Sequence, residues 1–233
     1  MARDRTLDAE WMQILPARSR RRTLAEIAAA YALILIVIWT PRPYQRWLWW
    51  VASAAVITVI CVSFDGLDAM GLRRVNFLRS LWVIGAALLI AAVDIAIAAH
   101  LHTLLVPPGP VPFIRAYFAY AIWAFVQQFL LQGFFLLRFM RLLPTGRSAA
   151  LVAAGLFALA HLPNPVLTPI TLVWGVAACF IFLRYRNLYA LGVAHAIFGI
   201  AIAITIPGPV DHNMRVGLGY ITYHHRTHRL HGN

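Results

Sequence analysis

Six polar or ionisable side chains lie inside long apolar stretches of this sequence and could carry out chemistry there. They are Asp94, Gln127, Gln128, Gln132, His161 and His195. A polar group in an apolar environment costs free energy unless it has a partner, so each of these residues is a candidate for a functional site. The histidines could accept or donate a proton and the aspartate could accept one, whereas the glutamines could only give and accept hydrogen bonds.

The three glutamines form a polar stripe in the segment AFVQQFLLQGFF, residues 124–135. Gln128 and Gln132 are four residues apart and share a helix face, and Gln127 widens the stripe. One interpretation is that the amides hold this helix to its neighbours through interhelical hydrogen bonds. The other is that they line a polar site, because three amides on one helix exceed what helix association usually needs.

His161 ends one apolar stretch, in FALAHLPNP, and His195 lies within another, in LGVAHAIFGI. A lone histidine in such a stretch is more often a packing residue than a ligand. The helical rise nevertheless puts both histidines and Gln127 at a similar depth, so the three could converge inside a helical bundle. Asp94 lies near the depth of His161 and could orient it; the alternative is an aspartate near the far membrane interface that reaches water.

The composition indicates that membrane-spanning helices position these groups. The chain has 233 residues, of which 61% are hydrophobic and 12% charged, and its mean hydropathy is +0.73. A soluble domain would carry about twice that charged fraction. Together with the long apolar runs, this predicts an all-α polytopic membrane protein with a single helical domain.

We predict about seven transmembrane helices within a helical domain of residues 23–206. They cover residues 24–40, 47–64, 80–99, 113–138, 148–162, 166–183 and 188–206. Thr23 and Glu26 form a candidate capping box at the start of the first helix. Pro163 ends the fifth helix early, because the residue before a proline disfavours helix. Residues 1–22 form a polar N-terminal segment and residues 207–233 a polar, histidine-rich tail.

All 20 basic residues are arginines, and the formal net charge is +12. In a soluble protein this charge would favour nucleic acid, but arginines that flank membrane spans contact anionic lipid headgroups. With the N-terminus in the cytoplasm, 14 arginines fall on the cytoplasmic side and 6 on the other. We therefore expect an integral membrane protein with a cytoplasmic N-terminus, whose partner is the lipid bilayer and not nucleic acid.

The tail carries His224, His225, His228 and His231. Three of these would share a face in a helix and could then bind a divalent metal, whereas a solvated basic tail is the simpler interpretation. Within the spans, His161 and His195 supply only two ligands, and metal sites usually need three or more. The sequence therefore assigns no cofactor, and zinc is left without a full ligand set.

In this order, the motifs QQ…QG, FALAH and HAIFG resemble the CAAX-processing and bacteriocin-processing (CPBP, or Abi) family of intramembrane proteases. The resemblance covers about residues 113–206. In that family one helix carries a glutamate pair followed by arginine and glycine. A second helix carries Phe and His four residues apart, and a third carries His and Asn four residues apart. Phe157 and His161 match the second motif, His195 matches the start of the third, and Gly133 matches the glycine.

The resemblance implies a membrane endopeptidase of the bacterial inner membrane that acts on membrane-associated proteins. It also implies that the first glutamate and the second-motif histidine activate a water, while the third-motif histidine and asparagine stabilise the oxyanion. This sequence has Gln127 and Gln128 in place of the glutamates, Gln132 in place of the arginine and Gly199 in place of the asparagine. An amide cannot take the proton of water. The three glutamines indicate a site neutralised as a unit, which avoids an unpaired buried charge.

Two functions remain open at this point. In the first, the chain is an intramembrane endopeptidase with His161 and His195 as catalytic residues. A water held by Gln127, or the carboxylate of Asp94, would complete that site, and Asn164 could replace the missing oxyanion donor. In the second, the chain is a non-catalytic homologue that binds a membrane protein segment or peptide in the same cavity. The resemblance favours the first function, and the chemistry of Gln127 favours the second.

Overall fold

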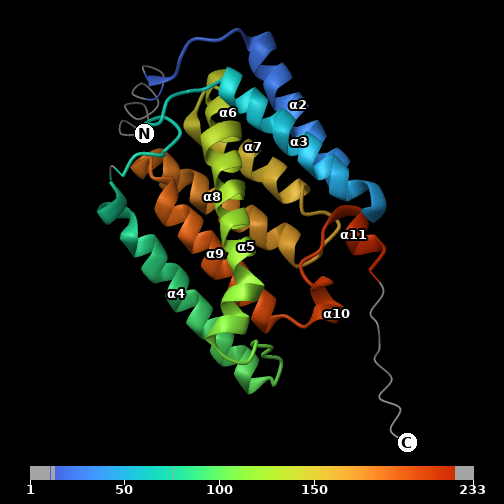
Figure 1. Cartoon of the computed structure of the whole chain (residues 1–233). Helices are drawn as coiled ribbons and strands as arrows, with labels where there is room; N and C mark the ends of the chain where they lie inside the picture. Colours follow the sequence, from blue (N-terminus) through green and yellow to red (C-terminus); the bar gives the residue numbers. More distant parts are fainter. Residues whose placement is uncertain (1–10, 12–13, 75, 224–233) are drawn as a thin grey trace, which may run out of the picture.

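The computed structural model describes residue 11, residues 14–74 and residues 76–223, and the regular secondary structure in this part of the chain is helical (Figure 1). The predicted spans correspond to α2 (Arg20–Ile38), α3 (Arg42–Val62), α4 (Phe77–His100), a continuous α5–η1–α6 segment (Pro110–Gln128, Phe129–Leu136 and Leu137–Leu142), α7 (Gly146–Leu159), α8 (Leu167–Tyr185) and α9 (Leu188–Thr205). The all-α prediction is confirmed.

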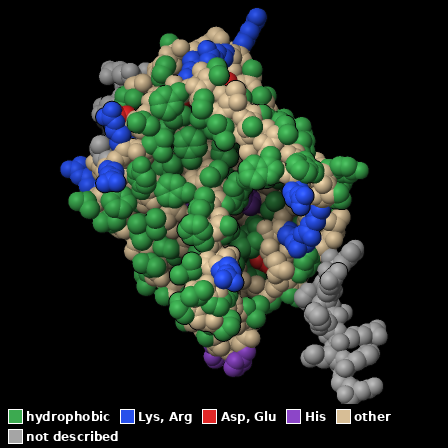
Figure 2. Space-filling view, viewed as in Figure 1, with side chains coloured by type: hydrophobic (Ala, Val, Ile, Leu, Met, Phe, Trp, Pro, Cys, Tyr) green, Lys and Arg blue, Asp and Glu red, His purple; other side chains and the backbone are tan. Residues whose placement is uncertain are grey.

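Five of these segments are long and apolar enough to cross a membrane: α3, α4, α5–η1–α6, α8 and α9. The other two predicted spans, α2 and α7, are respectively too charged and too short to meet this criterion. The first turns of α2 carry several arginines and Glu26, and α7 has only 14 residues. Apolar side chains cover much of the face seen in Figure 2, with arginines at its upper and left margins and a few more beside and below the hollow. The chain is therefore an integral membrane protein.

The predicted capping box at the start of α2 is wrong by one helical turn. Ser19 is the N-cap, and its side chain accepts a hydrogen bond from the backbone N–H of Arg22. Thr23 is buried inside the helix and donates its hydroxyl to the carbonyl of Ser19. Glu26 is consequently free to pair with arginines. The early end of α7 agrees with the prediction, since the helix ends at Leu159.

The α5–η1–α6 segment runs through the middle of the molecule and contacts the helices that carry the other motifs (Figure 1). Its first part, α5, packs against α9, which also packs along α4. Its π-helical part, η1, contacts α7, α8 and α9. The α2–α3 hairpin covers another side through contacts between α2 and α6. This central position brings the three predicted motifs to one region of the bundle.

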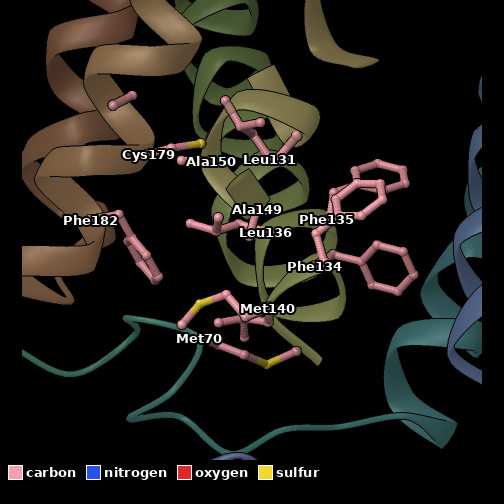
Figure 3. Packing of buried hydrophobic residues seen from close by; sticks show 14 of the residues in the cluster. Met70, Leu131, Phe134, Phe135, Leu136, Met140, Ala149, Ala150, Cys179 and Phe182 are labelled. Carbon is pink, nitrogen blue, oxygen red and sulfur yellow. The ribbon is translucent and has the colours of Figure 1, made fainter. Parts of the chain in front are cut away.

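The hydrophobic core is densest around η1 and α6, where large side chains meet small residues of α7 (Figure 3). Leu131, Leu136 and Met140 of the central segment lie with Ala149 and Ala150 of α7 in one buried cluster. Small residues also let α7 and α8 approach closely. A Cβ placed on Gly175 of α8 would be 3.2 Å from the Cβ of Ala154. The contact fixes α7, and with it the turn that carries His161.

A buried cluster of charges ties α6 to α2 and to the loop after α3. The fully buried Arg138 pairs with Glu26 at 3.1 Å and with Asp65 at 3.2 Å. Asp65 also pairs with Arg18 at 2.9 Å and with Arg141 at 2.6 Å. Because every carboxylate here is matched by a guanidinium, we interpret the cluster as a structural clamp. The sequence analysis did not predict that Arg138 is buried.

The prediction of a polar tail is wrong for residues 207–223, which fold back on the bundle. They form the short helices α10 (Gly208–Asp211) and α11 (Gly217–Ile221), and α11 contacts α2. The backbone N–H of Gly217 donates to the carbonyl of Leu162 at 2.7 Å. The histidines of the tail, for which metal binding and a solvated basic segment were the two interpretations, lie outside the described residues: His224, His225, His228 and His231.

Candidate active-site cavity

A cavity of about 1040 Å³ lies between α2, α4, α5, α7, α8 and α9. The predicted residues that line it are Asp94, Gln127, Phe157, His161, His195 and Gly199. Most of the other lining side chains are aliphatic or aromatic. Figure 2 shows a hollow in the surface with a histidine visible inside it. A mainly apolar cavity with a few polar groups suits an apolar ligand that is oriented by hydrogen bonds.

His161 lies in the turn that follows α7, and a backbone contact fixes its protonation pattern. Its Nδ1 is 2.7 Å from the carbonyl oxygen of Phe157. A carbonyl can only accept, so Nδ1 carries a proton, and in the neutral imidazole Nε2 then keeps its lone pair. The ring also makes an edge contact with the ring of Phe157, with centroids 4.8 Å apart. His161 therefore presents a held imidazole with one basic nitrogen.

In His195 the other ring nitrogen is protonated, because a side-chain amide donates a hydrogen bond to Nδ1. Gln132 Nε2 donates to Gln128 Oε1 at 2.8 Å, and Gln128 Nε2 lies 2.5 Å from Nδ1 of His195. With the Gln128 amide as donor, Nδ1 accepts and the ring proton is on Nε2. Gln128 and Gln132 are both fully buried and do not line the cavity. Gln128 is therefore a positioning residue for His195.

The two cavity histidines thus offer complementary groups. His161 has an unprotonated Nε2 that can accept a proton, and His195 has an Nε2–H that can donate a hydrogen bond. Phe157 lies against both rings, with centroid distances of 4.8 Å and 5.9 Å. Hydrolysis of a carbonyl compound needs a base for the water and a donor for the developing oxyanion, and this arrangement has one of each.

Residues 108–201 match the family model of Rce1-like type II CAAX prenyl endopeptidases. This Rce1-like segment is fewer than half of the 233 residues and includes Gln127, His161 and His195. The match confirms the resemblance to the CPBP family of intramembrane proteases. No curated protein and no solved structure matches the chain significantly.

Two further candidates line the cavity without a partner among the described residues. Gln127, in the Rce1-like segment, makes no side-chain hydrogen bond there and so can hold a water or a ligand group. Asp94 of α4 likewise forms no ion pair or hydrogen bond within the described part of the chain. Of the two interpretations of Asp94, orientation of His161 through Nδ1 does not occur, because the Phe157 carbonyl occupies that nitrogen.

Asn164 does not have the oxyanion role that the sequence suggested. Its Oδ1 accepts the backbone N–H groups of Val166 and Leu167, at 3.0 Å and 2.9 Å, at the start of α8. Its Nδ2 donates to the carbonyls of Asp211 and Arg215. Both polar atoms are used, and the side chain is fully buried outside the cavity lining. Asn164 instead attaches residues 207–223 to the bundle.

Two cavity residues in the Rce1-like segment were missed by the sequence analysis. Tyr120 of α5 packs against Gly199 of α9, where a Cβ would overlap its hydroxyl and ring. Trp174 of α8 lies near His195, with ring centroids 6.3 Å apart, and its buried Nε1–H has no partner among the described residues. The helical spacing of Tyr120 and Gln127, seven residues apart, was the available signal.

Metal chemistry has no ligand set in the part of the chain that the structure describes. There, no group of three or more His, Cys, Asp and Glu side chains is arranged to hold an ion.

Proposed function

We propose that this chain is an intramembrane endopeptidase that hydrolyses a peptide bond in a membrane-anchored substrate, with His161 as the general base. The observation that carries the proposal is the contact between His161 Nδ1 and the Phe157 carbonyl at 2.7 Å. In the neutral imidazole this contact selects the tautomer whose Nε2 is unprotonated, on a residue that lines the same cavity as His195 and Gln127. The match of residues 108–201 to Rce1-like endopeptidases supports the same class of reaction.

In the proposed reaction, the amide of Gln127 holds the attacking water and the imidazole of His161 takes its proton. The water oxygen forms a bond to the carbonyl carbon, and the electron pair of the C=O double bond moves to the carbonyl oxygen. Nε2–H of His195 stabilises that oxygen. The electron pair on that oxygen then re-forms the C=O double bond, the C–N bond breaks with its pair going to the nitrogen, and the leaving nitrogen receives the proton from His161. A neutral histidine can act as the general base for this water. A positioned general base contributes about 10²–10⁴-fold in rate.

The apolar lining favours a substrate that carries a lipid chain close to the scissile bond. Trp82, Ile90, Val173 and Ile181 belong to this lining. A cavity of about 1040 Å³ is large enough for an isoprenoid chain together with several peptide residues. The family resemblance implies the bacterial inner membrane, and the arginine distribution favours an N-terminus in the cytoplasm.

A second candidate function is binding without catalysis. Its supporting observation is the neutral amide chain from Gln132 through Gln128 to His195, which contains no carboxylate. Gln127, in the cavity wall, is also an amide and cannot act as a base. In this function the cavity holds the lipid chain and peptide of a partner, and no bond is broken.

Cleavage of a farnesylated peptide with a CAAX C-terminus, by the purified chain reconstituted in lipid vesicles, distinguishes the two functions. We expect the parent to cleave it and His161→Ala to reduce kcat by about 100-fold or more. His100→Ala is a matched control, because His100 is exposed at the end of α4 and does not line the cavity. Saturable binding without cleavage by the parent would favour the second function. Cleavage that His161→Ala leaves unchanged would exclude His161 as the base.

A further inference from the structure

The absence of a side chain at Gly199 lets Tyr120 pack against α9 one helical turn from His195. Gly199 is buried in α9, four residues after His195, and so lies about 6 Å further along the helix axis. A Cβ at this position would overlap the Oη, Cζ and Cε1 atoms of Tyr120. The glycine is therefore required by the close approach of the phenol, and the phenol occupies the place of a side chain at position 199.

The hydroxyl of Tyr120 is available for a ligand. Tyr120 lines the same cavity as His161 and His195. Its O–H forms no hydrogen bond with any residue in the described part of the chain, unlike Tyr31, which donates to the carbonyl of Leu156 at 3.0 Å. Tyrosine hydroxyls that are removed from bulk water usually have a hydrogen-bond partner. The Tyr120 side chain is half-buried, so its hydroxyl is free to donate to a molecule that fills the cavity.

We propose that Tyr120 donates a hydrogen bond to the carbonyl oxygen of the scissile peptide bond, beside the Nε2–H of His195. This inference rests on the proposed endopeptidase function. Tyr120 keeps its proton throughout: it stabilises the negative charge that collects on the oxygen as water attacks, and the proton of the water goes to His161. Two donors from two helices, α5 and α9, then converge on one oxygen, which is the arrangement of an oxyanion hole.

The main test is Tyr120→Phe, which removes the hydroxyl and keeps the ring in the space beside Gly199. We expect kcat for the farnesylated CAAX peptide to fall about 100-fold and KM to rise by at most about tenfold, since the donor stabilises the oxyanion of the transition state more than the carbonyl of the bound substrate. The melting temperature should stay near that of the parent, because the hydroxyl has no partner in the described protein. Tyr44→Phe, an exposed position on α3, is the matched control and should keep full activity. An unchanged kcat in Tyr120→Phe would overturn the proposal.

A second variant pair moves the donor to the other helix. Tyr120→Ala should lose the donor and open space beside Gly199. Adding Gly199→Ser to Tyr120→Ala places a hydroxyl on α9 in that space. We expect kcat of the double variant to be at least tenfold higher than kcat of Tyr120→Ala. A purely packing role for Tyr120 predicts instead that Tyr120→Phe is fully active and that the serine gives no recovery.

A binding measurement separates failure of this inference from failure of the proposed function. If the parent does not cleave the peptide, the endopeptidase function is wrong, and the role of Tyr120 is then decided by affinity. The probes are the farnesylated peptide and its analogue in which the scissile carbonyl is reduced to a methylene. We expect Tyr120→Phe to weaken binding of the carbonyl peptide by about fivefold to tenfold, the effect of one hydrogen bond, and to leave binding of the analogue unchanged. Equal affinities of the parent and Tyr120→Phe for the carbonyl peptide would overturn the inference.

Discussion

The amide nitrogen of Gln128 on α5 lies 2.5 Å from Nδ1 of His195 on α9, and this contact couples the glutamine stripe to the cavity. Gln132 extends the chain by donating to Gln128 at 2.8 Å. Two of the three glutamines, Gln128 and Gln132, thus form a neutral hydrogen-bonded unit with His195. Gln127 is separate from it and lines the cavity.

Removal of the Gln128 amide should cost stability and activity together. In Gln128→Ala, the Nδ1 of His195 loses its donor, and we expect the free energy of unfolding to fall by roughly 0.5–2 kcal/mol, the range of interhelical hydrogen bonds in membranes. Thermal melting in detergent measures the first effect, and peptide cleavage the second. Val126→Ala, at an exposed position of the same helix, is the control. Equal melting temperatures of Gln128→Ala and Val126→Ala would contradict a structural role for the hydrogen bonds from Gln132 through Gln128 to His195.

Introduction of a cation into the neutral chain should be more damaging than deletion of an amide. Gln132 is fully buried and donates to Gln128. Gln132→Arg therefore buries a positive charge beside a neutral amide and not beside a carboxylate. We expect a loss of about 3–5 kcal/mol, the cost of an unpaired buried charge. The double variant Gln132→Arg with Gln128→Glu restores a pair and should recover part of that loss. A lone arginine variant that melts like the parent would disprove the neutral-unit interpretation.

Gln127→Glu should increase cleavage. A carboxylate at this cavity position can accept the proton of the water, which the amide cannot, and we expect a rise in kcat of about tenfold or more. Gln127→Met, which has neither donor nor base, should fall below the parent. Comparison of the three proteins at saturating peptide tests the role of this position. Equal rates in all three would mean that Gln127 does not contact the reacting water.

Arg138 should be far more important for stability than an arginine at the surface. Arg138→Met removes the guanidinium shared by Glu26 and Asp65, which keep other arginine partners, and we expect a loss of about 1.5–3 kcal/mol, the size of a hydrogen bond to a charged group. Arg73→Met is the matched control, because Arg73 pairs with Asp68 at 2.8 Å at an exposed site, where a pair contributes about 0–1 kcal/mol. Chemical denaturation of the two variants in the same detergent gives the comparison. Similar losses in both would argue against a clamp at Arg138.

Several features of this protein follow from the sequence because they depend on local chemistry. The apolar runs predict the helices, since the backbone must satisfy its own hydrogen bonds in lipid. Pro163 predicts the early end of α7 for a steric reason. The order of the motifs around Gln127, His161 and His195 predicts the family that the comparison of residues 108–201 supports.

Other features depend on how the helices rotate against one another, which no local pattern determines. Gln127 and Gln128 are adjacent, yet one lines the cavity and the other bonds to His195, because neighbouring helical residues point about 100° apart and α9 lies on only one of these sides. Asn164 becomes a clamp for residues 207–223 only because that segment folds back. Tyr120 packs against Gly199, which is 79 residues later in the sequence, because the glycine has no side chain to exclude the phenol. Such contacts are set by packing between distant segments, so only the tertiary structure decides them.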